Sequence, residues 1–231
     1  FNSYIKDLER KFFKFIDIFK AQKKFISETE IVKNTQFNKI ILSDQNSPLY
    51  IEGHYESLLY FLDFEKDLKK KLKIKHELLD LSNPLINKIK NLNSVSIHLR
   101  KNRFNDDVNN TNLNNDFKSN KFEIDTIKYI EKSIIFLDKE LNNPHYFIWS
   151  NDIIKSKKDF VNSDKFTFIE NNTTAMDFHL FSLCKHFIVG PSTFHWWGAW
   201  LNENDNKICL RPSNINPSNN KDFWPKDWIV I

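Results

Sequence analysis

Residues 187–201 of the chain read FIVGPSTFHWWGAWL. The apolar run at its start is typical of a short buried strand, and Gly190-Pro191 predicts a tight turn after it. Hydroxyl side chains then stand at Ser192 and Thr193, where a helix would begin. The first N–H groups of a helix have no partner within the helix and lie at the positive end of its dipole. The segment therefore predicts a site for an anion such as a phosphate. The alternative is that Ser192 only caps the helix and that the tryptophans pack against a sheet.

The segments on both sides continue this alternation of strand and helix. We predict strands at residues 95–98, 146–149, 166–169, 187–189 and 207–210, and helices at 123–142, 175–186 and 193–203. Strands separated by helices predict a parallel sheet with right-handed crossovers. We therefore predict the α/β class, with residues 94–231 as one Rossmann-like domain and residues 1–93 as the remainder of another α/β domain.

The first part of the chain is less clearly patterned. We expect helices at residues 1–30 and 56–75, a strand at 40–42, and a mobile loop at the Asn- and Asp-rich stretch 104–120. Lys69-Lys70-Lys71 is interpreted as a solvated helix face, with contact to a membrane surface as the alternative. Because the chain starts with Phe1 inside an expected helix, we expect it to be a fragment of a longer protein.

Composition excludes several classes of protein. With 231 residues, 40% hydrophobic and 28% charged, the chain can bury a core. Its 3 glycines cannot form a glycine-rich dinucleotide or P-loop motif, and a net charge of +4 is too mild for a nucleic-acid binder. The longest apolar run, residues 58–62, is too short to span a membrane. Cys184 and Cys209 are expected to be reduced core thiols, which is typical of a cytoplasmic protein.

Ligands of open α/β sheets bind at the carboxyl ends of the strands. At the first predicted end, alternation places Ser96, His98 and Arg100 on one face. A guanidinium matches the oxygens of a diphosphate and keeps its charge at all working pH values. The alternative is a surface arginine beside a histidine that is satisfied within the core.

Two further segments carry polar residues near strand ends. Ser150-Asn151-Asp152 is either a helix cap or a ligand contact. Residues 174–177 resemble a capping box, and Asp177 could also accept hydrogen bonds from a base such as guanine. No D-x-D pair occurs in the chain, so we expect no metal and assign the stabilisation of a leaving phosphate to positive side chains.

Taken together, these segments resemble the α-1,2-fucosyltransferases of glycosyltransferase family 11. The family shows H-x-R-R-x-D-Y at the first strand end, where residues 98–104 read HLRKNRF. It shows a Phe-Ser-Asp-Asp segment, where residues 149–152 read WSND. It then shows D…L-x-S-x-C-x-H, matched by Asp177, Leu180, Ser182, Cys184 and His186, and N-S-T-F-S-W-W-G-A-W-L, matched by residues 190–201. The resemblance extends from about residue 48 to the C-terminus.

The resemblance implies a GT-B-like arrangement in which residues 1–93 belong to the acceptor side and residues 94–231 bind the donor, GDP-fucose. It implies inverting, metal-independent transfer of L-fucose to the 2-hydroxyl of a galactose in a glycan, without a cofactor. Arg100 would be catalytic through the diphosphate. The donor-binding residues implied are His98, Arg100, Lys101, Ser150, Asn151, Asp152, Asp177, Ser192 and Thr193.

The chain departs from the family pattern at three positions that bear on the site. Lys101 stands in place of the second arginine, Arg103 in place of aspartate, and His195 where the family often has serine. Two alternatives therefore remain: a related glycosyltransferase with another linkage or sugar nucleotide, and a non-catalytic fragment that binds a nucleotide or glycan. We expect a cytoplasmic location, peripheral at the inner membrane if the lysine run contacts lipid, and no nucleic-acid partner.

Overall fold

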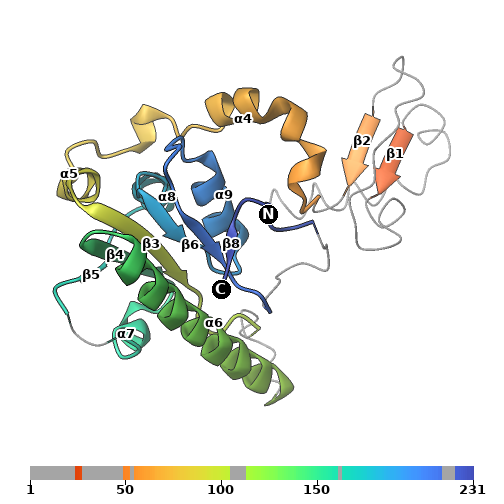
Figure 1. Cartoon of the computed structure of the whole chain (residues 1–231). Coiled ribbons are helices and arrows are strands. Elements are labelled where there is room, and N and C mark those ends of the chain that lie inside the picture. The colour runs from red at the N-terminus through yellow and green to blue at the C-terminus, as the bar shows by residue number, and fades with distance from the viewer. Residues whose placement is uncertain (1–23, 28–48, 53–54, 105–112, 161–162, 215–221) are drawn as a thin grey trace. The chain divides into compact units, whose positions relative to one another are not determined.

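The computed structural model describes residues 24–27, 49–52, 55–104, 113–160, 163–214 and 222–231 (Figure 1). The chain separates into two compact units, residues 1–63 with 218–224 and residues 64–217 with 225–231. These units divide after Asp63, whereas the strand and helix pattern of the sequence predicts a boundary at 93/94. Which part serves the acceptor and which the donor stays a prediction.

The described residues of the first unit contain a parallel strand pair. It joins β1 (Lys24–Ser27) to β2 (Leu49–Glu52), and η1 (Leu58–Tyr60) follows. The helix expected over residues 1–30 is wrong at residues 24–27, because pairing with β2 satisfies the backbone there. The strand expected at 40–42 lies outside the described residues.

The described residues of the second unit form a six-stranded parallel sheet in the order β5-β4-β3-β6-β7-β8. Its strands are β3 (Asn93–Leu99), β4 (Pro144–Ser150), β5 (Phe166–Phe168), β6 (His186–Ile188), β7 (Cys209–Arg211) and β8 (Ile229–Val230). The α/β class and the Rossmann-like parallel sheet are thus confirmed. The chain builds outward from β3 to β5 on one side and from β6 to β8 on the other. The order therefore reverses between β3 and β6, which is the topological switch point of such sheets.

Helices cover both faces of this sheet (Figure 1). The helices described after η1 are η2 (Leu62–Phe64), α4 (Glu65–Lys71), η3 (His76–Leu78), α5 (Pro84–Asn91), α6 (Leu113–Glu140), α7 (Ile153–Ser156), α8 (Thr174–Ser182) and α9 (Thr193–Leu201). Helix α6 lies across one face, and α8 and α9 lie on the other.

Two sequence expectations need correction here. The loop expected at 104–120 ends early, since α6 already begins at Leu113. Its early turns contain Lys118 and Lys121, which favour a helix more than the preceding asparagines do. The helix expected at 56–75 is broken into short 3-10 turns before α4, because Ser57 caps a separate turn by accepting the N–H of Leu59.

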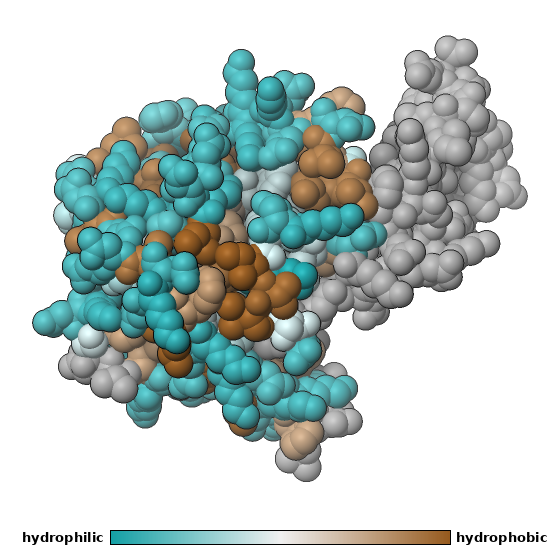
Figure 2. Space-filling model, in the orientation of Figure 1, coloured by the Kyte–Doolittle hydropathy of each residue, from teal (hydrophilic) through white to brown (hydrophobic). Residues whose placement is uncertain are grey.

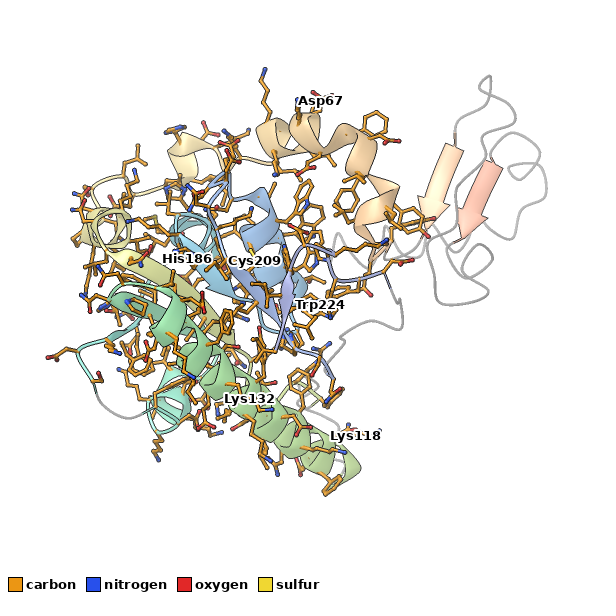
Figure 3. The ribbon with its side chains drawn as sticks, viewed as in Figure 1. Asp67, Lys118, Lys132, His186, Cys209 and Trp224 are labelled. Atoms are coloured by element: carbon orange, nitrogen blue, oxygen red, sulfur yellow. The ribbon has the colours of Figure 1, made fainter. Side chains whose placement is uncertain are left out.

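The core between β3 and α6 follows from the alternation of side chains along β3. Val95, Ile97 and Leu99 are fully buried and pack with Tyr129 and Ile130 of α6. On the same helix, Lys118 and Lys132 lie on the exposed side, whereas His186 and Cys209 lie within the sheet (Figure 3). The face of β3 that carries Ser96 and His98 is left to meet α8 and α9.

Thiols and surface agree with the composition. Cys184 and Cys209 are both free and buried, and burial raises the pKa of the Cys209 thiol to about 12. Hydrophilic side chains cover most of the described surface in the view of Figure 2, with hydrophobic ones gathered in smaller areas. Within the described residues, no helix is long and apolar enough to cross a membrane.

Candidate active site

The switch point brings the first and third predicted strand ends together. Ile97 of β3 pairs with Ile188 of β6, so the residues after both strands leave the same edge of the sheet. A Cβ atom on Gly190 would lie 2.7 Å from the carbonyl oxygen of His98. Only glycine allows the turn to lie this close to β3. Ser192 and His98 therefore lie at the same carboxyl edge of the sheet.

Helix α9 begins as its sequence predicts. Ser192 is the N-cap residue with extended backbone angles, φ −142 and ψ 131, and its carbonyl oxygen accepts the N–H of Trp196 at 2.9 Å. Within the described first turn of α9, the Ser192 hydroxyl accepts no N–H group. Thr193 is exposed beside it. The hydroxyl is thus not used for capping, and it lies at the helix end that favours an anion.

His98 lies next to this turn, at the end of β3. Its ring is 5.9 Å from that of Phe194 and 5.8 Å from that of His195, and its Nδ1 has no hydrogen-bond partner among the described residues. Burial, and then the charge of Arg100, lower the pKa of His98 to about 4. The imidazole is therefore neutral at neutral pH. Arg100 follows on the same face by alternation and is exposed, so a cation stands at the mouth.

Asp177 lies in the first turn of α8, on the same face of the sheet. Its Oδ1 accepts hydrogen bonds from Trp149 Nε1 at 3.2 Å and from Asn172 Nδ2 at 3.1 Å. Burial raises the pKa of its carboxyl group. The two bonds fix the carboxylate and leave Oδ2 with neither donor. The N-cap of this helix is Thr173, which accepts the N–H of Met176, and not Thr174 as the capping-box interpretation required.

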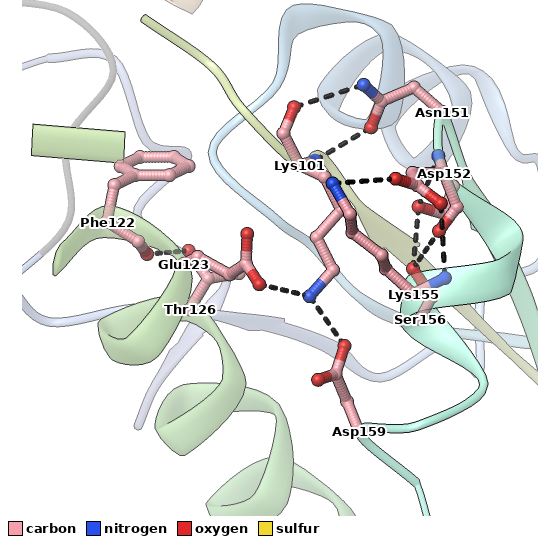
Figure 4. Close-up of polar contacts among 10 residues, drawn as sticks. Lys101, Phe122, Glu123, Thr126, Asn151, Asp152, Lys155, Ser156 and Asp159 are labelled. Atoms are coloured by element: carbon pink, nitrogen blue, oxygen red, sulfur yellow. Dashed lines mark hydrogen bonds and ion pairs between the residues drawn. The ribbon is translucent and has the colours of Figure 1, made fainter. Parts of the chain in front are cut away.

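Lys101 points to the opposite face. Its side chain is 1% exposed and forms ion pairs with Glu123 of α6 and, at 2.6 Å, with Asp159 (Figure 4). Alternation explains this, because Lys101 continues the buried series of Leu99 while Arg100 continues that of His98. In this structure the ammonium group is neutralised within the fold, and the expected donor contact of Lys101 finds no support.

The Ser150-Asn151-Asp152 segment lies beside Lys101 and contacts its backbone (Figure 4). Asn151 joins the ends of β3 and β4, since its Oδ1 accepts the N–H of Lys101 at 2.7 Å and its Nδ2 donates to the Lys101 carbonyl at 3.0 Å. Ser150 Oγ accepts the N–H of Asp152 at 3.1 Å. Asp152 is the N-cap of α7 and accepts the N–H of Lys155 at 3.1 Å. The structure thus gives these three residues contacts within the fold and does not bring them to the group around His98.

Sequence reasoning missed two side chains that hold the turn. His195 is fully buried, and its Nδ1 accepts the N–H of Gly190 at 3.0 Å. Arg103 donates from Nη1 to the carbonyl oxygen of Pro191 at 2.6 Å, and its guanidinium lies 4.9 Å from the ring centroid of Phe122. Their signal in the sequence is their departure from the family pattern.

The tryptophans of α9 are explained by packing. Trp196 and Trp200 stack at 6.0 Å between ring centroids, Trp228 lies 5.7 Å from Trp196, and all three are at most 5% exposed. Trp197 meets Trp200 edge-on at 5.5 Å. Their burial seats α9 firmly, so its N-terminus is a fixed point at the edge of the sheet.

A separate pocket of about 370 Å³ lies elsewhere in the second unit. Its lining includes Lys73, Phe178, His179 and Glu203. Lys73 and Glu203 form an ion pair across it at 3.1 Å. The pocket adjoins the C-terminal end of α9, so it is not the anion-favouring end. Across the described residues, no cluster of three or more His, Cys, Asp or Glu is arranged to hold a metal ion.

Comparison with known proteins gives a consistent relationship. The model of Glycosyl transferase family 11 matches residues 12–231. An alpha-1,2-colitosyltransferase of Escherichia coli is 29% identical over 225 residues, which cover 94% of this chain and 72% of that protein. The O-antigen biosynthesis glycosyltransferase WbnK of Escherichia coli is 28% identical over 200 residues, which cover 80% of this chain and 64% of that protein. No solved structure is significantly similar to the chain.

Proposed function

The chain belongs to glycosyltransferase family 11, and from this premise we propose that it transfers L-fucose from GDP-fucose to the 2-hydroxyl of a galactose in a glycan. One observation carries the proposal. At the switch point between β3 and β6, the cation of Arg100 and the open N-terminus of α9 stand at the same edge of the sheet. This is where open α/β sheets bind nucleotides, and both features favour the negative charge of a diphosphate.

The residues of this edge divide the work of holding the donor. Arg100 holds the diphosphate, and Ser192 and Thr193 hold it from the helix end. His98 and Asp177 lie on the same face of the sheet and are the expected contacts to guanine. Asp177 is a hydrogen-bond acceptor that Trp149 holds in position. The contacts of Asn151 and Asp159 with Lys101 hold the chain just after Arg100 in place.

The reaction moves negative charge onto the donor phosphate. The acceptor 2-hydroxyl oxygen attacks the anomeric carbon of the β-linked donor, the bond to the phosphate breaks, and the hydroxyl proton leaves to a base. GDP departs with the electron pair, and an α-linked product results. Because Arg100 and the α9 dipole meet the growing charge, the proposal needs no metal ion.

A related donor is the second candidate. The similarity to an alpha-1,2-colitosyltransferase favours the hypothesis that this chain transfers colitose in place of fucose. The site would hold the GDP part of either donor in the same way, so the choice between the donors lies in contacts to the sugar.

For the location of the protein, the buried free thiols favour the cytoplasm, and Lys70 and Lys71 offer a peripheral contact to anionic lipid at the inner membrane.

The test is a transfer assay with the full chain, lactose as acceptor, and GDP-fucose or a GDP-linked colitose as donor. Mass spectrometry detects the trisaccharide and NMR assigns its linkage. We expect an α-1,2-linked deoxysugar, and loss of at least most activity in Arg100→Ala. Transfer of colitose alone would favour the second candidate. Binding of GDP without any transfer would favour the non-catalytic alternative and contradict the proposal.

A further inference from the structure

We infer that His195 is a positioning residue for the donor site, because it fixes the Gly190-Pro191-Ser192 turn that presents the N-terminus of α9. The inference rests on the proposed function, since the position of this turn matters to the reaction only if the turn holds the donor diphosphate. His195 is buried and touches the site through Gly190 and Ser96.

The two ring nitrogens of His195 have different tasks. Nδ1 accepts the N–H of Gly190 at 3.0 Å, so it carries no proton. The neutral ring therefore has its proton on Nε2, which lies 3.2 Å from Ser96 Oγ in β3 and donates to it. One side chain thus joins the end of β6 to β3 across the switch point, from within the first turn of α9.

The surroundings keep this arrangement in a single form. The ring of Phe181 in α8 packs edge-on at 4.1 Å, and that of His98 lies at 5.8 Å. Burial, and then the neighbouring His98, lower the pKa of His195 well below its ordinary value. The ring therefore stays neutral and keeps its acceptor at Nδ1.

The turn is held at three places in sequence. Gly190 donates to His195, the Pro191 carbonyl accepts from Arg103 at 2.6 Å, and the Ser192 N–H donates to the Gly190 carbonyl at 2.8 Å. Gly190 also lies against the backbone of His98, so a displaced turn would move relative to both β3 and α9. Electrostatic stabilisation of a leaving group depends on donors held within about 0.5 Å of their working positions.

Two substitutions separate the two bonds of His195. In His195→Asn the side-chain oxygen takes the place of Nδ1, so the bond to Gly190 can remain while that to Ser96 is lost. In His195→Gln the side-chain amide reaches the place of Nε2, so the bond to Ser96 can remain while that to Gly190 is lost.

His186 provides a matched control at the other edge of the sheet. Its Nδ1 also accepts a backbone N–H, that of Ile208 at 3.1 Å, and its Nε2 lies 3.2 Å from Asn93 Oδ1. His186 is the first residue of β6 (Figure 3), whereas Gly190 lies beyond the other end of that strand. His186→Gln removes the same kind of bond away from the proposed site.

GDP affinity of the full chain is measured by calorimetry, with thermal unfolding in parallel. We expect His195→Gln to bind GDP about ten-fold more weakly, a change of the size that the loss of one hydrogen bond typically causes. His195→Asn should stay within about three-fold of wild type, and His186→Gln should match wild type. A merely structural role predicts instead that GDP affinity follows the loss in Tm, with Asn and Gln equally affected.

A second readout needs no nucleotide. The chain has 3 glycines, so protein labelled with ¹⁵N-glycine gives few amide signals. Gly190 alone follows a valine, so ¹³C labelling of the valine carbonyl assigns its signal without a substitution. We expect slow hydrogen exchange at Gly190 in wild type and His195→Asn, and faster exchange in His195→Gln. Equal exchange in all three overturns the inference, as does equal GDP affinity of Asn and Gln. Slow exchange with no GDP binding by wild type would contradict the proposed function, and with it a role of His195 in that function.

Discussion

At the scale of single residues, Arg100 is the side chain on which the proposed reaction depends most. Its guanidinium is proposed to stabilise the negative charge that develops on the leaving GDP. Arg100→Ala should therefore lower kcat by about 10²–10³-fold and change the acceptor KM much less. Arg100→Lys should restore little, because an ammonium cannot form the paired contact of a guanidinium. Steady-state kinetics at saturating acceptor measure this. Lys139→Ala, an exposed cation in the last turn of α6, is the control and should match wild type. A near wild-type rate in Arg100→Ala would place Arg100 outside the site.

Lys101 carries the opposite prediction, since its role is in the fold. Lys101→Met leaves Glu123 and Asp159 close together without their cation. We expect the free energy of unfolding to fall by about 3–5 kcal/mol, as when one partner of a buried ion pair is removed. Urea denaturation measures this, with Lys155→Met as control. Lys155 is 58% exposed in its pair with Asp152, so its loss should change the free energy by less than about 1 kcal/mol. A similar effect of both substitutions would show that burial of Lys101 adds nothing.

The pH dependence of stability should report on His98. Its pKa is lowered to about 4 in the fold and is near 6.5 in the unfolded chain, so the unfolded state binds more protons between these values. Stability from this group is therefore present above about pH 6.5 and is lost as pH falls toward 4. Between these limits, wild type should lose about 3 kcal/mol more than His98→Gln in urea denaturation. Parallel losses in the two proteins would mean that His98 is not buried in its neutral form.

At the scale of elements, the strand–turn–helix of residues 186–201 was predictable almost in full. The apolar run, Gly-Pro and the hydroxyls are local signals, and α9 begins at Thr193 as expected. The start of α6 was not predictable, because the loop expected before it rested on Asn and Asp content alone. The broken turns before α4 were not predictable either, since they depend on the cap that Ser57 forms. Contacts such as Asn151 to the backbone of Lys101 join residues far apart in sequence, so no local pattern could show them.

Ser192 tests the helix end directly. Its hydroxyl accepts no hydrogen bond from the described first turn of α9, so Ser192→Ala should change the free energy of unfolding by well under 1 kcal/mol. If the hydroxyl donates to a phosphate, GDP affinity should fall by about three- to ten-fold. Calorimetry and thermal unfolding of the same samples measure both. Thr173→Ala removes a hydroxyl that does cap α8, and it should show the reverse: about 1 kcal/mol less stability with GDP affinity retained. Unchanged GDP affinity in Ser192→Ala would remove the hydroxyl from the site.

At the scale of the whole molecule, the sheet order decides which strand ends lie together at the candidate site. Alternating strands and helices predicted a parallel sheet, but the reversal between β3 and β6 is a property of the assembled sheet. The resemblance of the separate motifs to one family implies that they form a single site, which no local pattern shows. Only that resemblance assigns Lys101 to the donor site. Alternation continued past Leu99 places Lys101 on the opposite face from Arg100, and the structure shows it there.

The most direct measurement is a calorimetric titration of the full chain with GDP in the presence of a metal chelator. We expect one binding site per chain, the same affinity with and without chelator, and a large loss of affinity in Arg100→Ala but not in Lys139→Ala. Binding that appears only when Mn²⁺ or Mg²⁺ is added, or that is equal in Arg100→Ala and wild type, would contradict a metal-free donor site at the β3–β6 switch point.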